Sequence, residues 1–267
     1  IVNCGKFMSV TREKYIHLPS PIEAELLRVF DRSDPLVIFD IGSCEGEDAI
    51  RYSRLFPKSA IYAFEPLPSN VEMIRKNIKN YNSPNVHVVK QALGATIGKS
   101  KFYVSSGAPP GSKNDDDWNF GNKSSSLFKP NLETMPEWLD FEEVIDVQIN
   151  TVNNFCEVNS IDRIDFIHLD VQGAELDVLD GASNVLSKTS LIWMEVENTE
   201  LYRGQPLKPE VEKFMYAQGF AKVVDTVNHV SGDQLYVSQD LAAQFASRSS
   251  FLGRITAMFT KKQGIKI

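Results

Sequence analysis

Residues 37–46, with the sequence VIFDIGSCEG, decide the fold of this chain. Their apolar start, which Asp40 interrupts near its end, is typical of a strand that is buried on both faces. Gly42 and Gly46 follow, and a helical pattern covers residues 48–56. A strand, a glycine turn and a helix let the backbone pass close to a nucleotide-like ligand, although the G-x-x-x-G spacing does not meet the dinucleotide fingerprint G-x-G-x-x-G. Glycines that only turn the chain are the alternative.

A second predicted strand, Ala60–Phe64, ends in Glu65. This acid lies 23 residues after Gly42, close to the spacing of about 20 at which a carboxylate binds ribose hydroxyls in nucleotide-binding folds. A carboxylate suits that role because it accepts two hydrogen bonds from a vicinal diol. A solvated acid at the end of a strand is the alternative.

Length and composition indicate one large α/β domain with additions. The 267 residues are 42% hydrophobic and 24% charged, as in ordinary globular proteins. The net charge of −7 argues against nucleic-acid binding, which needs a basic surface. Cys4, Cys44 and Cys156 match no zinc or disulfide spacing, so we expect a reducing, cytoplasmic compartment. No apolar run approaches about 18 residues, so we expect no stable membrane insertion, while the composition predicts no oligomeric state.

Strand and helix patterns alternate along the chain and finish with two adjacent strands. This alternation predicts an α/β fold with a Rossmann-like, mostly parallel sheet and helices on both faces. We expect an N-terminal segment over 1–35, with an extended lead-in over 1–20 and a helix from Pro21, then a main domain over 36–239 and an amphipathic tail over 240–267. After Glu65, strands are predicted over 86–90, 101–104, 144–149, 164–169, 191–196, 221–225 and 234–237, and helices over 69–80, 151–158, 174–186 and 209–218.

Polar side chains stand at the carboxyl ends of these predicted strands. In open α/β sheets, ligands bind at that edge. The sequence therefore predicts a binding site formed by Asp40, Glu65, Gln91, Asp170 and either Glu195 or Glu197.

Two further segments differ in composition from the rest. Residues 105–131 are rich in Ser, Gly, Asn, Pro and Asp and also carry Trp118, Phe120 and Phe128, which predicts a lid or a substrate-contacting loop, with disorder as the alternative. For the amphipathic tail over 240–267, docking on its own domain is favoured over contact with a membrane surface or a partner.

Four stretches carry a family resemblance: FDIGSCEG (39–46), YAFEPLPSN (62–70), KSSSLF (123–128) and DFIHLDVQGAELDVLDGA (165–182). Over roughly residues 36–237 the chain resembles the S-adenosylmethionine-dependent methyltransferases of the FkbM family. The resemblance implies a seven-stranded sheet of the class I methyltransferase type with its last strand antiparallel. It also implies methyl transfer from S-adenosyl-L-methionine to a hydroxyl of a small-molecule or glycan acceptor.

The resemblance also implies roles for individual residues. Asp40, Gly42 and Gly46 would shape the pocket for the methionine part of the cofactor, and Glu65 would hold the ribose. Asp170 would lie near the methyl group. The full expected cofactor set is Asp40, Gly42, Ser43, Gly46, Glu65, Pro66, Gln91, Ala92 and Asp170.

The chain departs from the family pattern near the expected site of reaction. The usual Gly-Ala-Asn turn is replaced by the sequence Gly-Ser-Cys at residues 42–44. The lysine that precedes the strand-end Asp is replaced by His168, and the Glu before the following Gly is replaced by Gln172. These changes bear on catalysis more than on the cofactor pocket.

For catalysis we expect His168, Asp170 and Glu195. His168 lies two residues before Asp170, so both side chains point to one side of the strand, and a histidine can remove the proton of an alcohol. A buried structural histidine is the alternative. In a second mechanism, Asp170, Glu197 and Asn198 would offer oxygen ligands to Mg²⁺ or Ca²⁺, although we predict no metal site.

Two other classes of function stay open from the sequence. An NAD(P)-dependent oxidoreductase would share the first turn and Glu65, although the G-x-G-x-x-G turn is missing. A non-catalytic S-adenosylmethionine-binding module would keep the fold, and His168 and Gln172 would then mark a lost active site.

Overall fold

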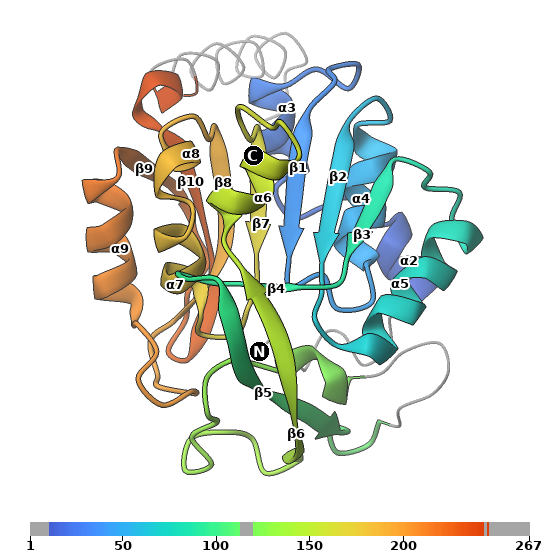
Figure 1. Cartoon of the computed structure of the whole chain (residues 1–267), viewed down its shortest axis with the longest axis vertical. Helices are drawn as coiled ribbons and strands as arrows, with labels where there is room; N and C mark the ends of the chain where they lie inside the picture. The colour runs from blue at the N-terminus through green and yellow to red at the C-terminus, as the bar shows by residue number, and fades with distance from the viewer. Residues whose placement is uncertain (1–10, 113–119, 243–244, 246–267) are drawn as a thin grey trace, which may run out of the picture.

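The computed structural model describes residues 11–112, 120–242 and 245, and a seven-stranded sheet forms its centre (Figure 1). The strand order is β3-β2-β1-β7-β8-β10-β9, and β10 runs antiparallel to both of its neighbours. The predicted Rossmann-like, mostly parallel sheet of the class I methyltransferase type is therefore confirmed. Its strands are β1 (Val37–Ile41), β2 (Ala60–Phe64), β3 (Val86–Val89), β7 (Phe166–Leu169), β8 (Leu191–Glu197), β9 (Phe220–Asp225) and β10 (Ser231–Ser238).

Helices cover both faces of this sheet, and each face has its own apolar core. On one face Leu26, Tyr52 and Ile74 from three helices pack against sheet residues such as Phe166. On the other face the helices α6 to α9 pack against residues such as Phe39. The helices are α2 (Arg12–His17), α3 (Glu23–Val29), α4 (Glu47–Leu55), α5 (Pro68–Asn80), α6 (Val152–Val158), α7 (Glu175–Asp180), α8 (Ser183–Leu186) and α9 (Lys208–Ala217).

A second, three-stranded sheet has the order β4-β6-β5, with β4 (Ala92–Leu93), β5 (Gly98–Gly107) and β6 (Leu139–Asn150). Figure 1 shows β5 and β6 extending beyond the carboxyl ends of β1 and β2. The segment between β5 and β6 contains the short 3-10 helix η1 (Gly121–Ser124). We call β5, β6 and the segment between them the arm. The arm brings a segment of the chain that is remote in sequence to the carboxyl edge of the main sheet.

Two predictions of local structure were wrong. Residues 1–20 are not an extended lead-in throughout, because α2 forms there with the Thr11 hydroxyl as its cap. The helix predicted over 174–186 is divided into α7 and α8 at Gly181, where an added Cβ would lie 2.1 Å from the carbonyl oxygen of Gly94. The neighbouring loop leaves no room for a side chain at Gly181, and helical periodicity does not report such a long-range contact.

The arm also differs from its prediction. Strands β5 and β6 extend well beyond 101–104 and 144–149, and the segment 105–131 is not loop throughout, because it contains the end of β5 and the helix η1. Trp118 lies outside the described residues, so its expected role stays a prediction.

Most of the C-terminal tail, residues 243–244 and 246–267, also lies outside the described residues. Phe245 is described, and it is buried with the guanidinium carbon of Arg28 5.2 Å from its ring centroid. The boundaries 1–35, 36–239 and 240–267 stay predictions. Within the described ranges, no helix is long and apolar enough to cross a membrane.

Candidate active site

Two adjoining cavities open at the carboxyl ends of the parallel strands. The first cavity holds about 520 Å³ of empty space, and residues that follow β1, β2 and β3 line it. The second cavity holds about 1150 Å³, and residues from α2, β1, η1, β7 and β8 line it. The two cavities share the residues Gly42, Cys44, Lys123, Asp170 and Gln172.

Gly42 forms the wall between β1 and β7. Its φ is +84°, a left-handed conformation that favours glycine. An added Cβ would lie 1.8 Å from the carbonyl oxygen of Asp170, so no side chain fits between the two strand ends. The amides of Gly42 and Ser43 both donate to the carbonyl oxygen of Phe64, which fixes the turn against β2.

Glu65 is the buried acid of the first cavity. Its Oε2 accepts from the Cys44 amide at 2.9 Å, and its Oε1 accepts from the Leu67 amide at 2.8 Å. Burial raises the pKa of Glu65 to about 8, although these two hydrogen bonds act in the opposite direction. The carboxyl group is therefore held in one orientation, and its oxygens retain lone pairs for a ligand hydroxyl.

His168 and Asp40 form a pair in the second cavity. The His168 Nδ1 lies 3.0 Å from Asp40 Oδ1, and the Ser43 hydroxyl donates to Asp40 Oδ2 at 2.5 Å. Burial disfavours the charged imidazolium, but the hydrogen bond and charge of Asp40 outweigh it and raise the pKa of His168 to about 9. The ring also packs edge-on against Tyr52. His168 is thus an oriented, partly accessible histidine that lines a cavity.

Gln172 connects the two remaining predicted catalytic acids. Its Nε2 donates to Asp170 Oδ1 at 2.5 Å and to Glu195 Oε2, while its Oε1 accepts from the buried Tyr202 hydroxyl at 2.8 Å. Burial, followed by the charge of Glu195, raises the pKa of Asp170 well above its usual value. Gln172 itself has a φ of +58°, a strained conformation for a residue with a Cβ. The acids are therefore held together at the junction of the cavities.

Aromatic side chains form the outer wall of the second cavity. They are Tyr15 of α2, Phe120 beside η1 and Trp138 beside β6. The Tyr15 hydroxyl donates to Asp48 Oδ2 at 3.1 Å, so this ring is held in place. The cavity therefore combines apolar ring faces with hydrogen-bonding carboxylates.

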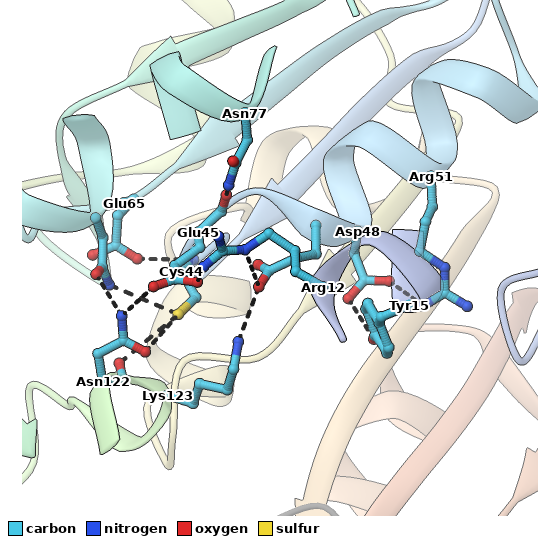
Figure 2. A network of polar contacts seen from close by, with 12 residues as sticks. Arg12, Tyr15, Cys44, Glu45, Asp48, Arg51, Glu65, Asn77, Asn122 and Lys123 are labelled. Carbon is cyan, nitrogen blue, oxygen red and sulfur yellow. Dashed lines mark hydrogen bonds and ion pairs between the residues drawn. The ribbon is translucent and has the colours of Figure 1, made fainter. Parts of the chain in front are cut away.

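Ion pairs and hydrogen bonds hold the turn between β1 and α4 from two sides (Figure 2). On one side Arg12 pairs with Glu45, and its Nε lies 3.8 Å from Glu47 Oε1. On the other side Asn122 donates to Glu45 Oε1 at 3.0 Å, and Lys123 Nζ lies 3.2 Å from Glu47 Oε1. These polar contacts thus allow two neighbouring glutamates to be buried, and one of them, Glu47, lines the second cavity.

The predicted site residues separate into two groups. His168, Asp170 and Glu195, expected to be catalytic, all line the second cavity. Of the expected cofactor set, Asp40 and Ser43 line the second cavity, and Gly46 lines neither cavity in the described part of the chain, because it begins α4 and faces Ile74. The other members line the first cavity: Gly42, Glu65, Pro66, Gln91, Ala92 and Asp170.

Residues that the sequence did not single out complete both cavities. Tyr15, Trp138 and Lys123 come from segments without a clear period, and the only available signal was that Lys123 begins the KSSSLF stretch.

Of the oxygen ligands expected in the metal alternative, Asn198 is engaged elsewhere, because its Nδ2 donates to the carbonyl oxygen of Asn228. Among the residues that the structure describes, no group of three or more His, Cys, Asp or Glu could hold a metal ion.

Comparison with known proteins places the chain in a family. Residues 40–222 match the model of the methyltransferase FkbM domain. The chain is 31% identical over 216 residues to the 2-O-methyltransferase NoeI of Sinorhizobium fredii (strain NBRC 101917 / NGR234), covering 80% of this chain and 84% of that protein. The chain belongs to the FkbM methyltransferase family. This FkbM methyltransferase is S-adenosylmethionine-dependent, as the sequence predicted, and the NAD(P)-dependent alternative is set aside.

Two more distant likenesses accompany these matches. The FkbM methyltransferase is 29% identical over 154 residues to Methyltransferase 1 of Beauveria bassiana (strain ARSEF 2860), covering 55% of this chain and 59% of that protein. An rRNA methylase from Streptococcus thermophilus has a TM-score of 0.46 and 11% identity, over 83% of this chain and 98% of that one.

The first cavity fits the chemistry of S-adenosylmethionine. A buried carboxyl group at the end of β2, Glu65, matches a ribose diol, and Gln91 and Ala92 line the same cavity after β3. The absence of a side chain at Gly42 keeps the backbone close to Asp170, where the first cavity meets the second.

Proposed function

We propose that this FkbM methyltransferase transfers a methyl group from S-adenosylmethionine to a hydroxyl of a carbohydrate or a related small-molecule acceptor. The acceptor would occupy the second cavity and the cofactor the first. The observation that carries this proposal is the pair of His168 and Asp40, which lines a cavity that meets the cofactor side at Asp170. A base that is oriented beside an acceptor cavity is what an alcohol substrate requires.

The cofactor, when bound, supplies a methyl group on a positively charged sulfonium. Glu65 accepts hydrogen bonds from the ribose, and Gln91 and Ala92 border the adenine. Asp170 borders the end of the first cavity that opens to the acceptor. Because methyl transfer is an in-line displacement, the principal contribution of these residues is alignment of the two reactants and exclusion of water.

His168 acts as the general base in this proposal. Its Nδ1 stays bonded to Asp40, so Nε2 is left to accept the proton of the acceptor hydroxyl. With a pKa of about 9 the imidazole is largely protonated at neutral pH in the ligand-free protein. A cationic cofactor near Asp170 favours the neutral imidazole, because like charges repel.

The wall of the second cavity supports a carbohydrate as the acceptor class. A sugar ring has an apolar face, which packs on rings such as Tyr15 and Trp138, and a rim of hydroxyls, which donate to carboxylates such as Glu195. The relative NoeI is a 2-O-methyltransferase, which supports oxygen as the acceptor atom.

A transfer assay tests the proposed function. S-adenosylmethionine with a labelled methyl group is incubated with a panel of oligosaccharides, other alcohols, amines and carboxylic acids. We expect label in an alkali-stable methyl ether and loss of transfer in His168→Gln. The exposed His87 of β3 supplies the control His87→Gln, which should retain activity. Label that appears only on amines or carboxylates would contradict the proposal.

A further inference from the structure

Lys123 stands at the junction of the two cavities and lines both. In the described part of the chain it is the one Lys, Arg or His side chain that lines the first cavity, where the acidic residues are Glu65 and Asp170. A single cation in a cavity that is otherwise lined by acids indicates a negative group on the ligand.

The backbone that carries Lys123 is fixed on both sides. Asn122 donates through Nδ2 to Glu45 Oε1 and to Asn70 Oδ1, each at 3.0 Å. The amide of Ser124 donates to the Ser105 hydroxyl at 3.0 Å, and its carbonyl oxygen accepts from a tyrosine hydroxyl. The helix η1 therefore presents Lys123 to the cavity from a defined position, as Figure 2 shows for Asn122 and Lys123.

The charge of Lys123 is supported by Glu47. The ammonium nitrogen lies 3.2 Å from Glu47 Oε1, and although burial acts against the charge, Glu47 holds the pKa of Lys123 above its ordinary value. Arg12 also approaches Glu47, at 3.8 Å, and pairs with Glu45, so neither glutamate depends on Lys123 alone. An ammonium group has three donors, and a ligand carboxylate can share it with Glu47.

S-adenosylmethionine carries one negative group, the α-carboxylate of its methionine end. If the ribose lies on Glu65, the methionine end lies toward the residues that both cavities share, since these border the acceptor. A carboxylate there would meet Asp170 and Glu47, and without a cation it would be repelled.

From this arrangement we propose that Lys123 binds the α-carboxylate of the methionine end of the cofactor. This inference rests on the proposed function, because it presupposes that the adenosyl ligand occupies the first cavity. It assigns a cofactor-binding role to the KSSSLF stretch, and thus to the arm that also contributes to the acceptor wall.

Calorimetric titration with two ligands tests this assignment. S-adenosylhomocysteine carries the α-carboxylate, whereas decarboxylated S-adenosylhomocysteine lacks only that group. We expect Lys123→Met to weaken binding of S-adenosylhomocysteine by about tenfold or more and to change binding of the decarboxylated ligand by less than about twofold. Lys123→Arg, which retains the charge, should restore part of the loss. The exposed Lys129 supplies the matched control Lys129→Met, which should bind both ligands as the wild type does.

Each other outcome overturns the inference in a distinct way. Equal weakening of both ligands would mean that Lys123 acts only on the turn through Glu47, and unchanged binding of both would place the carboxylate elsewhere. If the wild type binds neither ligand, the proposed use of the first cavity fails together with this inference. Thermal unfolding of each variant reports whether the fold is intact, and Lys123→Gln replaces the methionine variant if that variant unfolds.

Discussion

The two cavities of this FkbM methyltransferase are built in different ways. The first is lined mainly by short turns that directly follow strands, such as Gly42 after β1 and Glu65 after β2, and residues near η1 such as Lys123 complete it. The second is closed by side chains from segments that lie far apart in the sequence, such as Tyr15 and Trp138. In the proposed function, the cavity built from local turns binds the cofactor, and the assembled cavity contacts the acceptor. We therefore expect most substitutions to affect one binding event and leave the other intact.

The largest effect is expected at His168, which lines only the second cavity. His168→Gln should lower kcat by about 10²- to 10⁴-fold, the usual contribution of a general base, while S-adenosylhomocysteine binds as in the wild type. An equal loss of cofactor affinity would contradict the separation of the two cavities.

Substitution of Asp40, the partner of His168, should shift the pH profile of the reaction in a defined direction. Asp40 raises the pKa of His168 to about 9, so Asp40→Asn should lower that pKa. The rise of kcat/KM with pH should then move to lower pH, because the neutral imidazole forms earlier. An unchanged pH profile in Asp40→Asn would remove His168 from the role of base.

Gly42 lines both cavities, so its substitution is the exception that should affect both of them. Gly42→Ala would place a Cβ 1.8 Å from the Asp170 carbonyl oxygen, so we expect a loss of about 3 kcal/mol in unfolding free energy and loss of S-adenosylhomocysteine binding. Gly204 has a similar φ of +80° but open space around it, so Gly204→Ala should cost only about 1 kcal/mol. Equal costs in denaturant unfolding would show that the close approach to Asp170 is unimportant.

Substitution of Trp138 should weaken acceptor binding and leave cofactor binding intact, whereas substitution of Glu65 should weaken cofactor binding. Trp138→Ala removes an aromatic wall of the second cavity and should raise the acceptor KM about tenfold, or ~1.4 kcal/mol. The dissociation constant of S-adenosylhomocysteine should stay unchanged, and Trp138→Phe should recover part of the acceptor affinity. A parallel loss of cofactor affinity would mean that Trp138 also supports the first cavity, and it would contradict the separate use of the two cavities.

The smallest effect is a pH dependence of cofactor binding. Burial raises the pKa of Glu65 to about 8, so at pH 7 the carboxyl group is mostly protonated in the ligand-free protein. If the ribose binds the ionised form, binding releases a proton, and affinity for S-adenosylhomocysteine should rise about fivefold from pH 7 to pH 8. The rise should be absent in Glu65→Gln, and a rise that persists there would assign the proton to another group.

The sequence predicted the first cavity well because its residues follow buried strands. Parallel strands end at the same edge, so Glu65, Gln91 and Asp170 had to come together once the strands were recognised. Gly46 starts α4 and lines neither cavity among the described residues, so its expected role in shaping the pocket stays a prediction.

The second cavity was predictable only in part. His168 and Glu195 lie near the ends of strands and were identified, whereas Tyr15 and Trp138 are placed by long-range contacts that leave no periodic signal. Long-range contacts such as the ion pair between Arg12 and Glu45 and the hydrogen bond of Tyr15 to Asp48 hold α2 in place. The position of η1 depends on the antiparallel arm of β5 and β6, whose ends are too polar to show strand alternation.

Titration of S-adenosylhomocysteine into the wild type, Glu65→Gln and Trp138→Ala tests the central claim, that two separate cavities serve cofactor and acceptor, most directly. We predict binding in the micromolar range for the wild type and Trp138→Ala, and at least about tenfold weaker binding (~1.4 kcal/mol) for Glu65→Gln. Equal affinity of all three proteins would contradict the place of the ribose. Weakening by Trp138→Ala to the same extent as by Glu65→Gln would contradict the separation of the cavities.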